Sequence, residues 1–192
     1  MPFQHKRQTK IYYTYADYAS LPEEERCEII DGVLYMQAAP SRIHQEILME
    51  LSRQIANYLA GKPCKVYPAP FCVRLPDGDE KGDEDIKTVV EPDISIVCDQ
   101  SKLDGRGCIG APDMIVEITS PSSARKDRLE KFYKYERAGV KEYWIVEPEE
   151  KLVSVFVQGD NNRYGRPDIY TEGDEIKVSI FPDLVISLKN IF

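Results

Sequence analysis

The sequence contains no apolar run close to the roughly 18 to 20 residues that would cross a bilayer. Its N-terminal segment is basic but lacks the apolar centre of a secretion signal, and it reads MPFQHKRQTKIYYTY. The five cysteines are odd in number and include no Cys-x-x-Cys pair, which fits neither a disulfide framework nor a zinc motif. These absences argue against a membrane protein and favour a cytoplasmic one with reduced cysteines in its core.

Positive charge is also scarce, because 25 Lys and Arg residues face 33 Asp and Glu residues and the net charge is −8. Such a balance argues against a protein that coats nucleic acid by charge alone, although a local basic surface is compatible with it. The 192 residues, 42% of them hydrophobic, are enough to bury a sizeable core. We therefore expect a single domain over residues 1–192.

The apolar pattern predicts strands and helices in a mixed order. Two apolar segments around Asp31-Gly32 are typical of a hairpin. Apolar residues recur every three or four positions from Ile43 to Leu59, which predicts a helix capped by Ser41. Further expected elements are strands over 64–76, 89–99 and 112–120, a helix over 123–139 capped by Ser122 or Ser123, and a hairpin around Pro148. The economical architecture is a mixed β-sheet flanked by two helices, an α/β fold of the α+β type.

One carboxylate interrupts a strand that otherwise looks buried on both faces. Glu117 lies within the apolar run 114–118, where an ionised group is costly unless it is paired, protonated or bound to a metal. Because side chains alternate along a strand, Glu117 shares its face with Thr119. If strand 89–99 is the neighbour, Asp93 and Glu117 converge from strands roughly 4.8 Å apart. That geometry suits a shared divalent cation.

The pattern alone leaves two interpretations of the Asp93 and Glu117 pair open. Either the two carboxylates hold a cation, or each is a partly buried acid held by an Arg or a Lys. Asp113 shares the strand face of Glu117, but four residues at ~3.3 Å each separate the two by roughly 13 Å. Asp113 is therefore too distant to bind the same metal.

Three segments of the sequence carry a family resemblance, namely EPDISIV, PDMIVEITSPS and DRLEKFYKYERAGVKEYWIVEP. Together they resemble the Uma-type family of restriction-endonuclease-like proteins, a branch of the PD-(D/E)XK nuclease superfamily. CEIIDGVLY and SRIHQEIL stand in the family's order, so the resemblance covers about residues 26–157. It implies a restriction-endonuclease-like fold and hydrolysis of DNA phosphodiester bonds with Mg²⁺, or Mn²⁺ as a substitute. RNA stays open as a substrate, and cleavage of both strands of a duplex favours a homodimer.

The superfamily pattern needs an Asp, a second acid, and a Lys two residues after that acid. Asp93 and Glu117 match the first two positions, but Thr119 stands where the Lys is expected. The resemblance places the missing cation on the following helix, at Lys131. It thus implies that Asp93, Glu117 and Lys131 are catalytic. The expected metal ligands are Asp93, Glu117 and the backbone carbonyl of Ile118.

Helix periodicity does not decide which way Lys131 points. An apolar stripe that contains Leu129 and Tyr133 would normally face the core, and Lys131 lies nearly opposite it. If the other stripe packs inward, Asp127, Lys131 and Tyr135 stack over the strand ends at i, i+4 spacing. Otherwise Lys131 is a solvated lysine paired with Asp127.

Several polar residues near these segments have open roles. Glu28 and His44 occupy positions that the resemblance marks and could support the site, although a histidine near a helix start is often a cap. The basic residues of the second helix could contact phosphate or be merely solvated, and they are Arg125, Lys126, Arg128, Lys134 and Arg137. Because Thr119 replaces the usual Lys, the alternative function is a non-catalytic scaffold or interaction module that keeps the nuclease fold.

Overall fold

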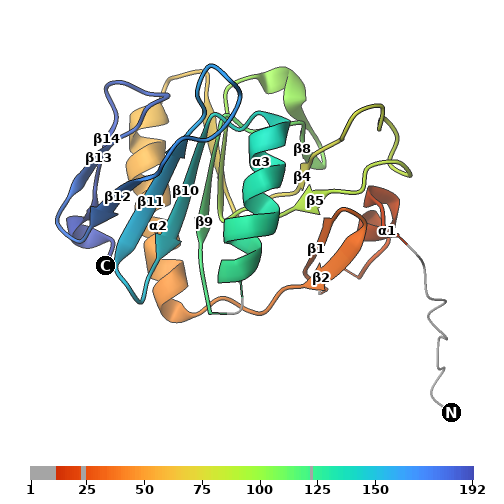
Figure 1. Ribbon diagram of the computed structural model, residues 1–192, viewed down its shortest axis with the longest axis horizontal. Helices are drawn as coiled ribbons and strands as arrows, with labels where there is room; N and C mark the ends of the chain where they lie inside the picture. Colours follow the sequence, from red (N-terminus) through yellow and green to blue (C-terminus); the bar gives the residue numbers. More distant parts are fainter. Residues whose placement is uncertain (1–11, 23–24, 122) are drawn as a thin grey trace, which may run out of the picture.

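The computed structural model describes residues 12–22, 25–121 and 123–192 (Figure 1). The helices in these ranges are α1 (Tyr15–Ala19), α2 (Arg42–Leu59), the π-helical turn η2 (Lys126–Lys131), α3 (Phe132–Ala138), and the 3-10 turns η1 (Gln100–Lys102) and η3 (Leu188–Asn190). None of the helices in the described ranges is both long enough and apolar enough to pass through a membrane.

Within the described residues, the strands fall into two sheets of six strands and one short hairpin. The central sheet has the order β12 (Asp168–Thr171), β11 (Leu152–Val157), β10 (Glu142–Glu147), β9 (Met114–Ile118), β6 (Ile94–Val97), β3 (Lys65–Pro68). The second sheet has the order β2 (Val33–Met36), β1 (Cys27–Ile30), β5 (Val89–Val90), β4 (Val73–Arg74), β8 (Gly107–Ile109), β7 (Leu103–Asp104). The hairpin pairs β13 (Glu175–Lys177) with β14 (Val185–Ser187).

The central sheet is mixed, because β9 and β10 run parallel while its other neighbours pair antiparallel. Helix α2 covers one face, and α3 covers the other (Figure 1). Side chains of β9 alternate as predicted: Met114 and Val116 pack with α2, whereas Ile115 packs with α3 and the second sheet. The α+β class with helices on both faces of a mixed sheet is thus confirmed.

The second sheet corrects the expectation of one continuous sheet. The predicted strand over residues 64–76 is two strands, β3 in the central sheet and β4 in the second sheet. The chain leaves the first sheet at Ala69 and Pro70, and proline has no N–H with which to continue a strand ladder. This break between β3 and β4 carries the chain from one layer to the other.

Both predicted helices form, and their ends follow from particular residues. The Ser41 hydroxyl oxygen accepts from the His44 N–H at 3.2 Å and caps α2. Gly139 ends α3 with φ 92°, a left-handed conformation that glycine adopts without a steric penalty. The predicted cap Ser122 lies outside the described residues. The unexpected feature is η2, in which the hydrogen-bond pattern widens to i to i+5 before α3 begins.

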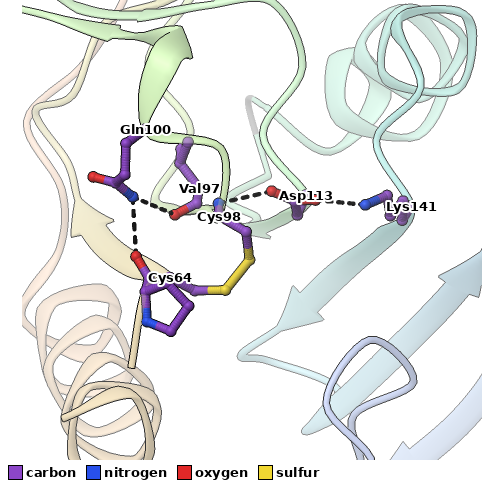
Figure 2. The surroundings of a disulfide bond; sticks show 7 residues. Cys64, Val97, Cys98, Gln100, Asp113 and Lys141 are labelled. Carbon is purple, nitrogen blue, oxygen red and sulfur yellow. Dashed lines mark hydrogen bonds and ion pairs between the residues drawn. A yellow bond between two sulfur atoms is a disulfide. The ribbon is translucent and has the colours of Figure 1, made fainter. Parts of the chain in front are cut away.

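The cysteine prediction was wrong for two of the five residues. Cys64 and Cys98 form a disulfide across the paired strands β3 and β6 (Figure 2). The two cysteines are 34 residues apart in sequence, and only the antiparallel pairing of these strands brings them opposite each other. Beside the bond, Asp113 accepts from the Cys98 N–H and pairs with Lys141 (Figure 2). Cys27 and Cys108 are buried free thiols, as predicted.

Candidate active site

The structure brings Asp93 and Glu117 to the same point. Strands β6 and β9 pair antiparallel with Ile94 opposite Val116, and this register, continued by one residue, sets Asp93 opposite Glu117. The backbone N–H of Ile118 donates to Asp93 Oδ2 at 2.7 Å and ties the two strand ends together. Asp93, Glu117 and Ile118 all line one cavity of about 1060 Å³. Asp113, by contrast, interacts with Cys98 and Lys141 near the disulfide, as Figure 2 shows.

Glu117 is enclosed by hydrogen-bond donors from the neighbouring helix. The residue is 4% exposed, and its Oε1 accepts from Lys131 Nζ at 2.9 Å and from the Tyr135 hydroxyl at 2.6 Å. Burial raises the pKa of Glu117 well above its ordinary value; Lys131 opposes this shift, and the nearby carboxylates of Asp127, Asp93 and Glu28 add to it. In the metal-free protein, the ionised form of Glu117 is therefore unfavourable.

Lys131 points inward and joins three carboxylates. Its Nζ lies 2.6 Å from Glu28 Oε1, 2.9 Å from Glu117 Oε1 and 3.7 Å from Asp127 Oδ1, and the residue is 3% exposed. Burial lowers the pKa of Lys131, but the three carboxylates more than compensate and hold it well above its ordinary value. Lys131 is thus an ammonium ion at the centre of the cluster, not a solvated lysine.

The polar stripe of the helix therefore packs inward, and the apolar stripe is partly left outside. Leu129 is 48% exposed and Tyr133 is 55% exposed, whereas Asp127, Lys131 and Tyr135 are buried. Partners on β1 and β9 explain this orientation. Lys131 pairs with Glu28 on β1 and with Glu117 on β9, and the Tyr135 hydroxyl donates to Glu117. Polar side chains can be buried where they find such partners.

The remaining two carboxylates of the cluster differ in their surroundings. Glu28, on β1 of the second sheet, accepts from the Glu91 N–H at 3.0 Å. Burial raises the pKa of Glu28, but Lys131 and Lys126 outweigh burial and hold the pKa below its ordinary value. Burial raises the pKa of Asp127, and the attraction of Lys131 offsets this in part only. Glu28 is therefore the carboxylate that most favours its ionised form.

His44 and Thr119 both line the cavity but do different things. His44 Nε2 lies 3.0 Å from Asp93 Oδ1, so this residue of α2 helps to orient the Asp93 carboxylate. Its Nδ1 is buried and has no hydrogen-bond partner within the described residues. The Thr119 N–H and hydroxyl both donate to the Val146 carbonyl, at 2.8 and 3.3 Å. Thr119 therefore hydrogen-bonds to strand β10 and does not supply the positive charge of the Lys expected at this position.

Sequence reasoning undervalued Lys126. Its Nζ lies 3.1 Å from Glu28 Oε2, and it lines the same cavity as Lys131. Three other basic residues of the helix pair with acids that do not line this cavity: Arg128 with Glu147, Lys134 with Asp31, and Arg137 with Asp77. No periodicity in the sequence distinguishes Lys126 from these three, because its orientation depends on the π-helical turn.

The donor set of this cavity fits a divalent cation that prefers oxygen ligands. Within the described ranges, no group of three or more His, Cys, Asp and Glu side chains is arranged to hold a metal. Mg²⁺, however, is commonly held by one or two carboxylates and keeps several waters, and Asp93 and Glu117 supply such a pair. Four carboxylates (Asp93, Glu117, Glu28, Asp127) against two ammonium groups (Lys126, Lys131) leave two negative charges when all are ionised. A divalent cation would balance them.

Comparisons with known proteins agree with this reading of the fold. Residues 14–189 match the family described as "Uma2: Putative restriction endonuclease". An uncharacterized protein of Synechocystis, slr1290, is 27% identical over 113 residues, which cover 59% of this chain and 55% of that relative. The matched region thus spans about half the length of this relative. A crystal structure from Anabaena variabilis, described as a "putative nuclease belonging to DUF820", is 22% identical. It has a TM-score of 0.73, covers 94% of this chain and 97% of its own, and shows the shared fold.

Proposed function

Because this chain belongs to the Uma2 family of restriction-endonuclease-like proteins, we propose that it is a Mg²⁺-dependent endonuclease that hydrolyses phosphodiester bonds of DNA. The observation that carries the proposal is the convergence of Asp93 and Glu117 on one cavity, where Lys131 Nζ lies 2.9 Å from Glu117 Oε1. RNA is a further candidate substrate, since these residues would act on the phosphodiester group, which DNA and RNA share, and not on a base. Mn²⁺ is expected to replace Mg²⁺.

Asp93 and Glu117 would hold the cation, and the backbone carbonyl of Ile118 is the expected third ligand. When bound, the cation would supply charge to the scissile phosphate and activate the attacking water. The two carboxylates are held in place by different neighbours: Asp93 accepts from the Ile118 N–H and contacts His44 Nε2, and Glu117 accepts from Lys131 and Tyr135. Such fixed ligands need little rearrangement when substrate binds.

Lys131 acts, in this proposal, through Glu117. Its ammonium group is buried and already surrounded by Glu28, Glu117 and Asp127. It therefore orients the Glu117 carboxylate and limits the repulsion among the three acids. A homodimer would present two such cavities to the two strands of a duplex.

The test is cleavage of supercoiled plasmid and of branched DNA by the purified protein. We expect cutting with Mg²⁺ or Mn²⁺, none with chelator, and background cutting by Asp93→Asn. The same substitution at the exposed Asp168 of β12 is the matched control and should cut like the wild type. Equal cutting by the Asp93→Asn variant, or cutting that survives the chelator, would show that the site is assigned wrongly. A protein that neither binds metal nor cuts would favour the scaffold alternative.

A further inference from the structure

We propose that Lys126 is the cation of this site that meets the substrate phosphate, so that the single lysine of the nuclease pattern is represented here by two lysines. Lys131 would position Glu117, and Lys126 would bind the phosphodiester. The inference rests on the proposed function, because it names the group that receives the phosphate in the same cavity.

Lys131 is poorly placed to receive a phosphate. Three carboxylates lie within 3.7 Å of its Nζ, and the residue is 3% exposed. A phosphodiester is itself an anion, so it would have to displace one of these carboxylates from a buried position. Displacing a paired buried carboxylate leaves it without compensation, which is strongly unfavourable.

Lys126 has the opposite surroundings. It lines the cavity, its side chain is 16% exposed, and Glu28 is the carboxylate that it pairs with, at 3.1 Å. Its Nζ also lies 5.0 Å from the centre of the Tyr35 ring, another residue of the cavity wall. The Lys126 ammonium group is thus at the boundary between the buried cluster and the open cavity.

Glu28 can release Lys126 without becoming an uncompensated charge. Lys126 contacts Oε2, whereas Oε1 of the same carboxylate accepts from Lys131 at 2.6 Å and from the Glu91 N–H at 3.0 Å. The flexible lysine stem lets the ammonium group turn from Glu28 to an incoming phosphate. Exchange of one anion for another at Lys126 therefore leaves Glu28 with two partners.

The π-helical turn explains how both lysines reach the cavity. Lys126 and Lys131 are the first and last residues of η2, five positions apart. In an α-helix, residues five apart lie about 140° apart around the axis, so one of the two would point elsewhere. The wider π turn places both on the side that faces Glu28, in keeping with the frequent occurrence of such turns at functional sites.

The experiment measures binding of a fluorescently labelled DNA duplex by anisotropy at several NaCl concentrations, with a low, fixed Ca²⁺ concentration. The variants are Lys126→Met, Lys126→Arg and Lys134→Met. Lys134 is the matched control. It lies on the helix that follows η2 and pairs with Asp31, in the turn between β1 and β2, but it does not line the cavity. Loss of one phosphate contact lowers the slope of log affinity against log salt by about 0.9.

We expect Lys126→Met to show that reduced slope, and Lys126→Arg and Lys134→Met to keep the wild-type slope. An unchanged slope for Lys126→Met, an equal reduction for Lys134→Met, or no measurable DNA binding by the wild type would each overturn the proposal. Failure of the proposed function would give a different result. If the wild type cuts no DNA but Lys126→Met still shows the reduced slope, the protein binds phosphate through Lys126 without hydrolysing it.

Discussion

Replacing Lys131 with Met is expected to destabilise the metal-free protein by about 3 to 5 kcal/mol near neutral pH, as removal of one partner from a buried ion pair does. Three carboxylates contact this ammonium group, and the variant leaves Lys126 as the one remaining lysine of the cluster among the described residues. Met has a similar length and fills the space, so the loss reports the missing charge and not a cavity.

The loss should shrink as the pH falls. The pKa of Lys131 is raised, so its stabilising contribution is fully present below its unfolded-state pKa of about 10.4 and is lost only as the pH rises through the higher folded value. Lys131 therefore stays charged in the wild type across the acidic range. In the Met variant, the stranded carboxyls can take up protons, which relieves their repulsion at low pH.

Urea unfolding of both proteins in chelator, at about pH 8 and about pH 5, measures this difference. Lys134→Met is the control, because it removes a lysine that pairs with one exposed carboxylate, and it should cost less than about 1 kcal/mol. A Lys131→Met protein as stable as the wild type at the higher pH would mean that the cluster does not depend on this ammonium group.

Glu28 and Glu117 are the two carboxylates closest to Lys131, and replacing each with Gln is expected to change stability in opposite directions. The folded-state pKa of Glu117 is raised, so ionising Glu117 opposes folding as the pH rises above its unfolded value of about 4.3. Glu117→Gln removes this penalty and should be as stable as the wild type or more stable at neutral pH. Lys131 keeps Glu28 and Asp127 as partners, so it is not stranded.

Glu28 behaves in the reverse way, because its folded-state pKa is lowered. Its contribution to stability is present above the unfolded value of about 4.3 and is lost as the pH falls through the lower folded value. Glu28→Gln should therefore cost about 1.5 to 3 kcal/mol at neutral pH, the range for hydrogen bonds to a charged group. The difference from wild type should vanish in strong acid.

Unfolding curves of the wild type and of the two variants from about pH 2 to about pH 9 in chelator provide the comparison. Glu117→Gln should also abolish metal-dependent cleavage while remaining folded, which separates a functional charge from a structural one. A loss of several kcal/mol in Glu117→Gln would instead make Glu117 chiefly the counterion of Lys131 and would count against its role as a metal ligand.

Strand alternation is sufficient to predict that Asp93 and Glu117 can meet if β6 and β9 are neighbours, because one register then places the two residues opposite each other. Periodicity does not predict that Lys131 points inward. The stripe with Leu129 and Tyr133 is the more apolar one, and a helix read by itself would bury it. The charged partner Glu28 decides the orientation, and it comes from a strand roughly a hundred residues earlier in the sequence.

Three other features depend on contacts that no local pattern contains. The Cys64–Cys98 disulfide depends on the pairing of β3 with β6. The second sheet depends on the chain changing layers after Ala69. The inward position of Lys126 depends on one π-helical turn, and the sequence of η2 has no glycine or proline to mark it.

Calorimetric titration with Mn²⁺ of the wild type and of Asp93→Asn tests most directly whether these carboxylates form a cation site. We predict a saturable binding isotherm for the wild-type protein and none for Asp93→Asn, with Asp168→Asn like the wild type. Mn²⁺ is used because it prefers the same oxygen ligands as Mg²⁺ and commonly binds more tightly. Identical isotherms for wild type and Asp93→Asn, or no binding by the wild type, would contradict the assignment of Asp93 and Glu117 as metal ligands.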